Sequence, residues 1–151
     1  MSEIRPFLYR CKSCGTKNKI PADKLSAAPN CGRCHAPLDT RELFLPQPVV
    51  VTTKDFEEKI LRSPIPVLLD CWAAWCSACQ AFSPVVQELG RIMSQRVRVA
   101  KINVEQNPAI SDRYNIMSLP TCLVFDGGQL RERFVGVIDR DDALFKMAKY
   151  T

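Results

Sequence analysis

Residues 67–79 read Val67-Leu68-Leu69-Asp70-Cys71-Trp72-Ala73-Ala74-Trp75-Cys76-Ser77-Ala78-Cys79, and this segment decides the fold of the chain. Its first three residues form an apolar run of the kind that lies buried inside a parallel sheet. Further along, apolar residues recur at helical spacing from Phe82 to Met93. The pattern predicts a buried strand that leads directly into an amphipathic helix.

Two cysteines stand where the predicted strand gives way to the helix. Cys76 falls at the helix N-terminus, where unpaired backbone N–H groups and the helix dipole favour the nucleophilic thiolate. Cys79 lies one turn further along on the same face and can close a disulfide with Cys76. Asp70 lies within the apolar strand, where burial raises the pKa of a carboxyl that finds no partner. A dithiol beside a proton carrier indicates thiol–disulfide exchange.

These residues resemble the active-site segment of the thioredoxin family, for which a Cys-x-x-C near a strand–helix–strand pattern is typical. The spacer differs, because most thioredoxins carry Gly-Pro between the cysteines and this chain carries Ser77 and Ala78. The resemblance covers about residues 49–151 and implies the α/β thioredoxin fold, a central mixed sheet flanked by helices. The expected order of elements is strand, helix, strand, helix, strand, helix, strand, strand and helix.

The resemblance also implies which residues form the site. Cys76 would attack a substrate disulfide, and Cys79 would resolve the mixed disulfide with help from Asp70. Lys101 falls close to where the family places a lysine beside its buried aspartate. The segment Leu119-Pro120-Thr121 resembles the family's cis-proline loop, whose backbone pairs with an incoming peptide. The residues expected to contact the substrate are Trp75, Ser77, Ala78, Leu119, Pro120 and Gly136.

Two helices outside this segment are also predicted. Thr53 is expected to cap a helix that ends near Arg62. Asp139 is expected to cap the last helix of the chain, whose residues Leu144, Phe145 and Ala148 would cover the sheet.

The first 45 residues contain two more Cys-x-x-C pairs. Sixteen residues separate Cys11 and Cys14 from Cys31 and Cys34, a spacing that is typical of a four-cysteine zinc site. Two disulfides or four free thiols are the alternatives, and His35 could replace Cys34 as a ligand. We expect one structural Zn²⁺ and no organic cofactor. The glycines Gly15 and Gly32 are expected to supply the backbone freedom that such cysteine turns use.

The pairs predict a zinc ribbon over residues 1–45, followed by a thioredoxin domain over residues 46–151. Pro46 and Pro48 stiffen the connection and mark the boundary. The ribbon narrows the resemblance to the bacterial zinc-containing second type of thioredoxin.

Composition argues against several other classes. No apolar run approaches the ~18 residues that a membrane span needs, and the charged segment 1–10 lacks the apolar core of a secretory signal. We therefore expect a cytoplasmic protein. The formal net charge is +5, and residues 1–45 hold eight Lys or Arg against four Asp or Glu. These basic residues lack interleaved aromatics, so we expect a solvated basic face rather than a nucleic-acid site.

The function expected from these observations is that of a monomeric protein-disulfide reductase, which the resemblance pairs with a flavin- and NADPH-dependent thioredoxin reductase. Three alternatives remain open: a more oxidising, isomerase-like or oxidant role caused by the Ser77-Ala78 spacer, a ribbon that acts as a binding module, and a zinc site that senses oxidation. The single cysteines Cys71 and Cys122 are expected in the core. Strand alternation points Cys122 toward the active-site helix and Asp70, where it could be a third redox-active thiol.

Overall fold

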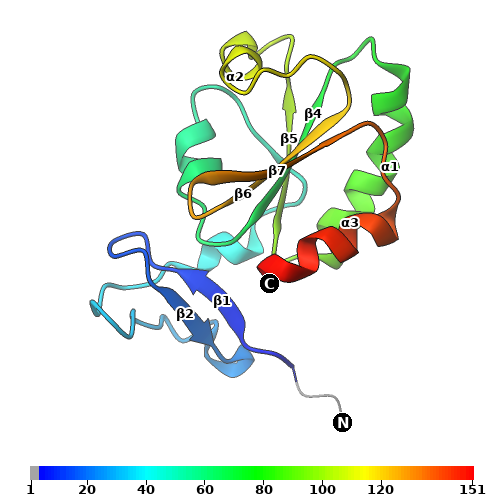
Figure 1. Ribbon diagram of the computed structural model, residues 1–151. Helices are drawn as coiled ribbons and strands as arrows, with labels where there is room; N and C mark the ends of the chain where they lie inside the picture. The colour runs from blue at the N-terminus through cyan, green and yellow to red at the C-terminus, as the bar shows by residue number, and fades with distance from the viewer. Residues whose placement is uncertain (1–3) are drawn as a thin grey trace.

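Two separate sheets form the framework of the protein, as the computed structural model shows (Figure 1). The structure describes residues 4–151. Segment 1–10, in which no secretory signal is expected, therefore lies partly outside the described residues. The small sheet pairs β1 (Phe7–Arg10) with β2 (Lys17–Ile20) in antiparallel register. The large sheet has the strand order β3-β5-β4-β6-β7.

The large sheet is mixed, as predicted. Strands β3 and β5 are parallel, as are β4 and β5, whereas β6 runs antiparallel to both β4 and β7. The strands are β3 (Val49–Val50), β4 (Val67–Trp72), β5 (Arg98–Asn103), β6 (Thr121–Asp126) and β7 (Gln129–Val135). The helices are α1 (Ser77–Ile92), α2 (Pro108–Arg113) and α3 (Arg140–Met147), with shorter helical turns η1 (Ala22–Lys24), η2 (Thr40–Phe44), η3 (Glu57–Leu61) and η4 (Ala148–Tyr150).

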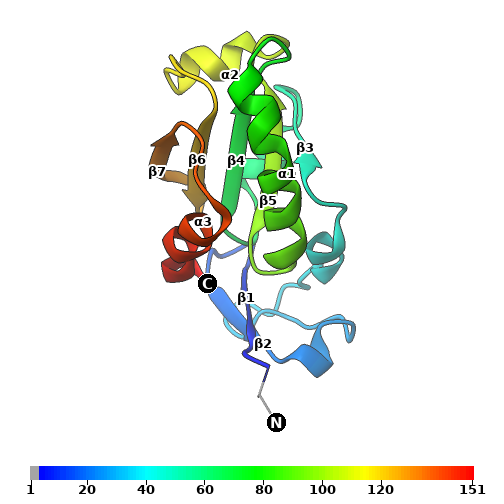
Figure 2. The ribbon, with the colours of Figure 1, turned by 90° about the vertical axis from the view of Figure 1, so that its right-hand side faces the viewer.

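Helical segments cover both faces of the large sheet (Figure 2). Phe82 of α1 and Met147 of α3 pack with Leu68 of β4 on one face. Ile60 of η3 packs with Leu69 of β4 on the other face. Because both faces are covered, β4 is apolar along its length apart from Asp70, and this explains the continuous apolar run in the sequence.

The prediction that Thr53 caps a helix is wrong. The backbone N–H and the hydroxyl of Thr53 donate to Oδ1 of Asn107, at 2.8 and 3.0 Å. The carboxylate of Asp55 accepts from the backbone N–H of Thr52 at 2.7 Å, and the helical turn η3 begins only at Glu57. The N–H and hydroxyl of Thr53 are therefore bonded to Asn107, which lies 54 positions further along the sequence, and Thr53 does not cap a helix.

The last helix is capped as predicted, but two residues of its predicted buried face, Phe145 and Ala148, are wrong. The carboxylate of Asp139 accepts from the N–H of Asp142 at 2.8 Å. The side chain of Phe145 is 84% exposed, and Ala148, which begins η4 after the end of α3, is also exposed. Ala143 and Met147 are buried instead. The apolar stripe of α3 therefore follows Ala143 and Met147, which are four residues apart and lie on one helical face.

The ribbon is joined to the large sheet by a network of charged side chains. Arg98 of β5 is only 1% exposed, and its guanidinium donates to the carbonyl oxygen of Lys59 at 2.8 Å. It also lies 3.7 Å from the carboxylate of Glu42 in η2. Nζ of Lys12, next to Cys11, lies 2.8 Å from Glu42 and 2.9 Å from Glu58 of η3. Glu42 thus forms ion pairs both with Lys12 of the first cysteine turn and with Arg98 of the large sheet.

The ribbon and the start of α1 lie at opposite ends of the molecule. Both ribbon views show β4 ending and α1 beginning at the end of the large sheet that is remote from β1 and β2 (Figures 1 and 2). Within residues 4–151, no helix combines the length and the apolar character that crossing a membrane requires.

Candidate active site and metal centre

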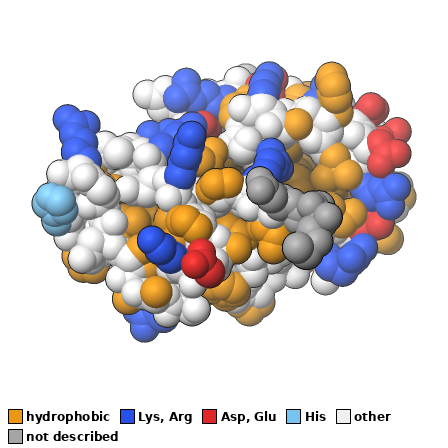
Figure 3. All heavy atoms as spheres, turned by 90° about the horizontal axis from the view of Figure 1, so that it is seen from below, with side chains coloured by type: hydrophobic (Ala, Val, Ile, Leu, Met, Phe, Trp, Pro, Cys, Tyr) orange, Lys and Arg blue, Asp and Glu red, His pale blue; other side chains and the backbone are white. Residues whose placement is uncertain are grey.

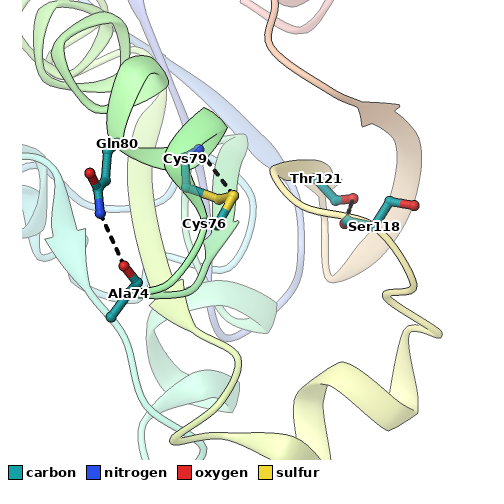
Figure 4. The surroundings of a disulfide bond; sticks show 6 residues. All are labelled: Ala74, Cys76, Cys79, Gln80, Ser118 and Thr121. Atoms are coloured by element: carbon teal, nitrogen blue, oxygen red, sulfur yellow. Dashed lines mark hydrogen bonds between the residues drawn. A yellow bond between two sulfur atoms is a disulfide. The ribbon is translucent and has the colours of Figure 1, made fainter.

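The cysteine pair lies at the start of α1, as predicted. Cys76 is the N-cap residue, and its extended backbone (φ −86°, ψ 107°) aims the side chain back over the first turn. Its Sγ accepts a hydrogen bond from the backbone N–H of Cys79 at 3.1 Å, and the two sulfurs form a disulfide (Figure 4). An N–H group held against Sγ stabilises negative charge on that sulfur. The geometry therefore favours a thiolate at Cys76 once the disulfide is reduced.

Asp70 and Lys101 are neighbours, as the resemblance implied. They are register partners on the parallel strands β4 and β5. Asp70 is 4% exposed, and its Oδ1 finds no hydrogen-bond partner among the described residues. Burial raises the pKa of Asp70 to about 6, and the positive charge of Lys101 partly opposes that rise. Nζ of Lys101 also lies 5.0 Å from the centre of the Trp72 ring. Asp70 can therefore exchange a proton near neutral pH.

The raised pKa of Asp70 makes a pH-dependent stability prediction. Below about pH 4 the carboxyl is protonated in both the folded and the unfolded chain. As the pH rises through the folded pKa of about 6, ionisation is easier in the unfolded chain and stability falls, by about 3 kcal/mol at pH 8. The effect of Asp70→Asn is the free energy of unfolding of the variant minus that of the unmodified protein. We expect this difference to be more favourable at pH 8 than at pH 4 by about 3 kcal/mol.

Urea denaturation of the oxidised proteins at both pH values measures this gain. Asp112→Asn is the matched control, because Asp112 is an exposed carboxyl on α2. A stability change in Asp70→Asn that is the same at pH 4 and pH 8 would contradict a raised pKa.

The two single cysteines are buried, as predicted, and they lie on opposite faces of the sheet. Cys122 is the cross-strand partner of Asp70 and packs in the layer that contains Phe82 of α1. Cys71 packs in the other layer, with Phe125. Burial raises the pKa of both thiols well above the ordinary value, and the charge of Asp70 adds to the rise. This environment favours the protonated thiol and a packing role for both residues.

The loop before β6 lies against the cysteine pair. The Leu119–Pro120 peptide bond is cis, as the resemblance implied, and Leu119 packs against the buried cluster that Ala73, Cys76 and Cys79 form. The N–H of Gly136 donates to the carbonyl oxygen of Pro120 at 2.8 Å, and Gly136 adopts the left-handed φ of +95°. The cluster that contains the cysteine pair therefore lies against a loop that is hydrogen-bonded to Gly136, the residue directly after β7.

Thr121, the first residue of β6, belongs to the predicted loop segment Leu119-Pro120-Thr121, but no role was predicted for its side chain. Its hydroxyl donates to the carbonyl oxygen of Ser118 at 2.6 Å and so closes the turn that contains Pro120 (Figure 4). A signal was present, since a threonine hydroxyl commonly bonds to a backbone carbonyl three residues earlier.

The surface around the pair exposes apolar side chains although the sulfurs themselves are buried. Cys76 and Cys79 are 5% and 4% exposed, whereas Trp75 is 69% exposed. Ser77 and Ala78 are also exposed. Met117, two residues before Leu119, is 84% exposed and was not singled out from the sequence.

The ribbon brings together the four cysteines predicted to bind zinc. The Sγ atoms of Cys11, Cys14, Cys31 and Cys34 all lie within 4.8 Å of one another. The N–H of Ser13 donates to Sγ of Cys11, and the N–H of Arg33 to Sγ of Cys31, both at 3.4 Å. Such N–H groups stabilise thiolates, the form in which cysteine binds metal. The donor set fits one structural Zn²⁺.

The two cysteine turns have the same backbone shape, with a left-handed residue directly after each Cys-x-x-Cys pair. The prediction that Gly32 supplies this conformation in the second turn is wrong. Gly15 and His35, each directly after a Cys-x-x-C pair, have the left-handed φ values +80° and +65°. Their N–H groups donate to the carbonyl oxygens of Cys11 and Cys31 at 2.8 and 2.9 Å. Gly32 is not left-handed, and its N–H donates to Oδ1 of Asn18. His35 therefore stands where the first turn has glycine, and the four-cysteine cluster does not include it.

A disulfide at a helix N-terminus, directly after a strand that contains a buried carboxyl of raised pKa, places this chain among the thiol–disulfide oxidoreductases. Residues 47–149 match the family model described as Thioredoxin, and residues 10–36 match one described as Thioredoxin 2, N-terminal. The chain belongs to the thioredoxin family, a family of protein-disulfide reductases.

Individual relatives agree with this assignment. Thioredoxin from Rickettsia bellii is 38% identical over 94 residues, which are 62% of this chain and 90% of the relative. Thioredoxin C-3 from Corynebacterium nephridii is 38% identical over 117 residues, 77% of this chain and 76% of the relative. Thioredoxin 1 from Synechococcus elongatus is 40% identical over 90 residues, 60% of this chain and 84% of the relative.

Proposed function

We propose that this chain reduces disulfides in other proteins, with Cys76 as the attacking thiolate and Cys79 as the resolving thiol. The observation that carries the assignment is the position of Cys76 at the N-cap of α1, where its Sγ accepts the N–H of Cys79 at 3.1 Å. Cys79 lies inside the helix and its sulfur can reach that of Cys76, as the disulfide shows. The first sulfur is thus activated, and the second is held ready to displace it.

The exchange proceeds in two steps. The Cys76 thiolate attacks one sulfur of the substrate disulfide, the substrate S–S bond breaks, and the other substrate sulfur leaves with the bonding electrons and takes up a proton. Asp70 then accepts the proton of the Cys79 thiol, and the resulting thiolate attacks Sγ of Cys76. The bond between Cys76 and the substrate breaks, and the second substrate sulfur leaves with the bonding electrons and takes up the proton that Asp70 accepted. The substrate has then gained two electrons and two protons, and Cys76–Cys79 remains as a disulfide.

Asp70 suits this proton transfer because its pKa of about 6 lies near neutral pH. Lys101 is proposed to keep that pKa from rising further, since its charge favours the carboxylate.

The substrate is proposed to bind as an extended peptide along the loop that contains Pro120. The backbone of Leu119 would pair with it as an added strand, as in other sheet-edge recognition. Trp75 would supply apolar contact area, while Gly136 would let the peptide approach closely, because a Cβ added there meets no atom within 4 Å. The proposed substrate contacts are therefore Trp75, Ser77, Ala78, Leu119, Pro120 and Gly136.

The partners follow from the family. Thioredoxins reduce disulfide substrates and are themselves reduced by thioredoxin reductase, and we propose the same cycle for this chain as a monomer in the cytoplasm. We propose no nucleic-acid partner. On the face that Figure 3 shows, Lys and Arg side chains are scattered among apolar and uncharged ones instead of forming one continuous patch.

The ribbon is proposed to be a structural domain over residues 1–45, with the thioredoxin domain over residues 46–151. The charged network around Glu42 and Arg98 supports a fixed attachment between them. Because the ribbon lies at the end remote from Cys76, its zinc would act on stability and not on the exchange chemistry.

The reduction potential of the Cys76–Cys79 pair tests the reductase assignment. The protein is equilibrated with a series of glutathione redox buffers, and the zinc content of the same sample is recorded. We expect a potential more negative than the cytosolic glutathione couple, which is about −220 to −260 mV by extraction. A value at or above that range would overturn the reductase assignment and favour the isomerase-like or oxidant role.

A further inference from the structure

The side chain of Gln80 reaches back from the first turn of α1 to the loop that precedes Cys76. Its Nε2 donates to the carbonyl oxygen of Ala74 at 3.0 Å (Figure 4). Ala74 lies between the end of β4 and Cys76. The hydrogen bond therefore joins the loop that carries Cys76 to the helix that carries Cys79.

The disulfide joins the same two segments. Two backbone hydrogen bonds around Cys76 involve neither sulfur: its N–H donates to the carbonyl oxygen of Ala73, and its own carbonyl accepts the N–H of Gln80, both at 3.2 Å. Ser77 and Ala78 add no ring that would fix a backbone torsion, as a proline spacer would. Figure 4 shows two further hydrogen bonds between the loop and α1: the N–H of Cys79 donates to Sγ of Cys76 at 3.1 Å, and the Gln80 side chain donates to Ala74. Of these two, the Gln80 contact is the one that does not involve a reacting sulfur.

We propose that Gln80 is a positioning residue, which holds the loop of Cys76 against α1 and so raises the effective concentration of the Cys79 thiol toward Cys76. The proposal rests on the exchange function proposed above. A tether that holds two groups close makes the bond between them more favourable. The converse also holds, because coupling between two equilibria is reciprocal, so the disulfide strengthens the Gln80 hydrogen bond by the same factor.

The balanced reaction on which this coupling acts is exchange with glutathione. The dithiol and one glutathione disulfide give the Cys76–Cys79 disulfide and two glutathione thiols, so two electrons pass from the protein to glutathione. Loss of the Gln80 tether removes stabilisation that is larger in the disulfide than in the dithiol. The equilibrium should therefore move toward the dithiol, which makes the pair more oxidising.

The test compares Gln80→Met with the unmodified chain in glutathione redox buffers. Methionine is similar in length to glutamine but has no N–H donor. We expect the constant for forming the disulfide to fall about threefold, which raises the potential by about 14 mV for a two-electron couple. Gln87→Met is the matched control, because Gln87 is an exposed glutamine further along the same helix. It should leave the equilibrium constant unchanged.

A rescue variant separates the tether from a general helix effect. Gln80→Lys restores a donor at the same position, and measurement at high salt screens its added charge. We expect it to return the equilibrium constant toward the original value.

An unchanged constant in Gln80→Met, or the same change in Gln87→Met, would overturn the role of Gln80. A lysine variant that behaves like the methionine variant would do so as well. An unmodified protein that exchanges no electrons with glutathione would be a different result, since it would overturn the proposed function and the tether together.

Discussion

Replacement of Cys76 by serine is expected to slow disulfide reduction by on the order of 10³-fold or more, because a hydroxyl cannot replace the thiolate as nucleophile. The N-cap position and the N–H of Cys79 would remain, but they would face an oxygen that stays protonated at neutral pH. The measurement is the rate at which the reduced protein cleaves a protein disulfide, followed by the appearance of free thiols.

Replacement of Cys79 should produce a different defect. Cys79→Ser keeps the attacking thiolate but cannot resolve the mixed disulfide, so the Cys76 adduct with substrate should accumulate and be visible by mass spectrometry. Cys122→Ala is the control, since Cys122 is buried behind the site at 1% exposure. It should keep its rate within about twofold if the residue only packs.

The opposite pattern would reverse the assignment. If Cys79→Ser lost the attack step and Cys76→Ser formed the adduct, then Cys79 would be the nucleophile. A large loss of rate in Cys122→Ala, with the fold intact, would restore the hypothesis of a third redox-active thiol.

Removal of zinc is expected to unfold the ribbon while the thioredoxin fold persists. Metal binding supplies on the order of 10 kcal/mol or more in small four-ligand zinc peptides at neutral pH. The ribbon core is small and includes Ile65, which comes from the segment before β4, so we do not expect it to hold without the metal. Unfolding of the ribbon would also take Glu42 away from the buried Arg98, which should cost the remaining domain about 3 kcal/mol.

Chelation followed by thermal denaturation and two-dimensional NMR measures both effects. We expect loss of the dispersed signals of β1 and β2, a lower midpoint for the rest, and disulfide reductase activity retained at low temperature. Cys31→Ala should reproduce these changes and lower the zinc content, whereas Cys71→Ala, a buried cysteine outside the cluster, should keep one zinc per chain. A ribbon that stays folded after complete removal of zinc would contradict the structural role of the metal.

The periodicity and spacing of residues within single segments were sufficient to predict much of the fold and of the site. The apolar run before Asp70 and the helical spacing after Cys79 predicted β4 and α1, because both periodicities belong to single segments. The spacing of the four ribbon cysteines predicted the cluster in the same way. The cis bond at Pro120 came from resemblance alone, since an X–Pro bond in an arbitrary sequence is usually trans.

Other features depend on contacts between elements, and the local sequence pattern did not predict them or predicted them incorrectly. Asn107 takes the N–H and hydroxyl of Thr53, so a local capping rule failed there. Phe145 faces solvent because α3 turns Ala143 and Met147 toward the sheet. The left-handed backbone in the second cysteine turn falls on His35 instead of Gly32.

The sequence by itself determined which residues could carry chemistry: a cysteine pair at a helix start, an acid in a buried strand and four cysteines with zinc-site spacing. Only the tertiary structure decided how those residues are surrounded. It set Asp70 between Lys101 and Cys122, buried Arg98 against Glu42, and brought the amide of Gln80 to the carbonyl of Ala74. The physical reason is that spacing acts within one segment, whereas burial, charge and hydrogen-bond partners are set by the segments packed around it.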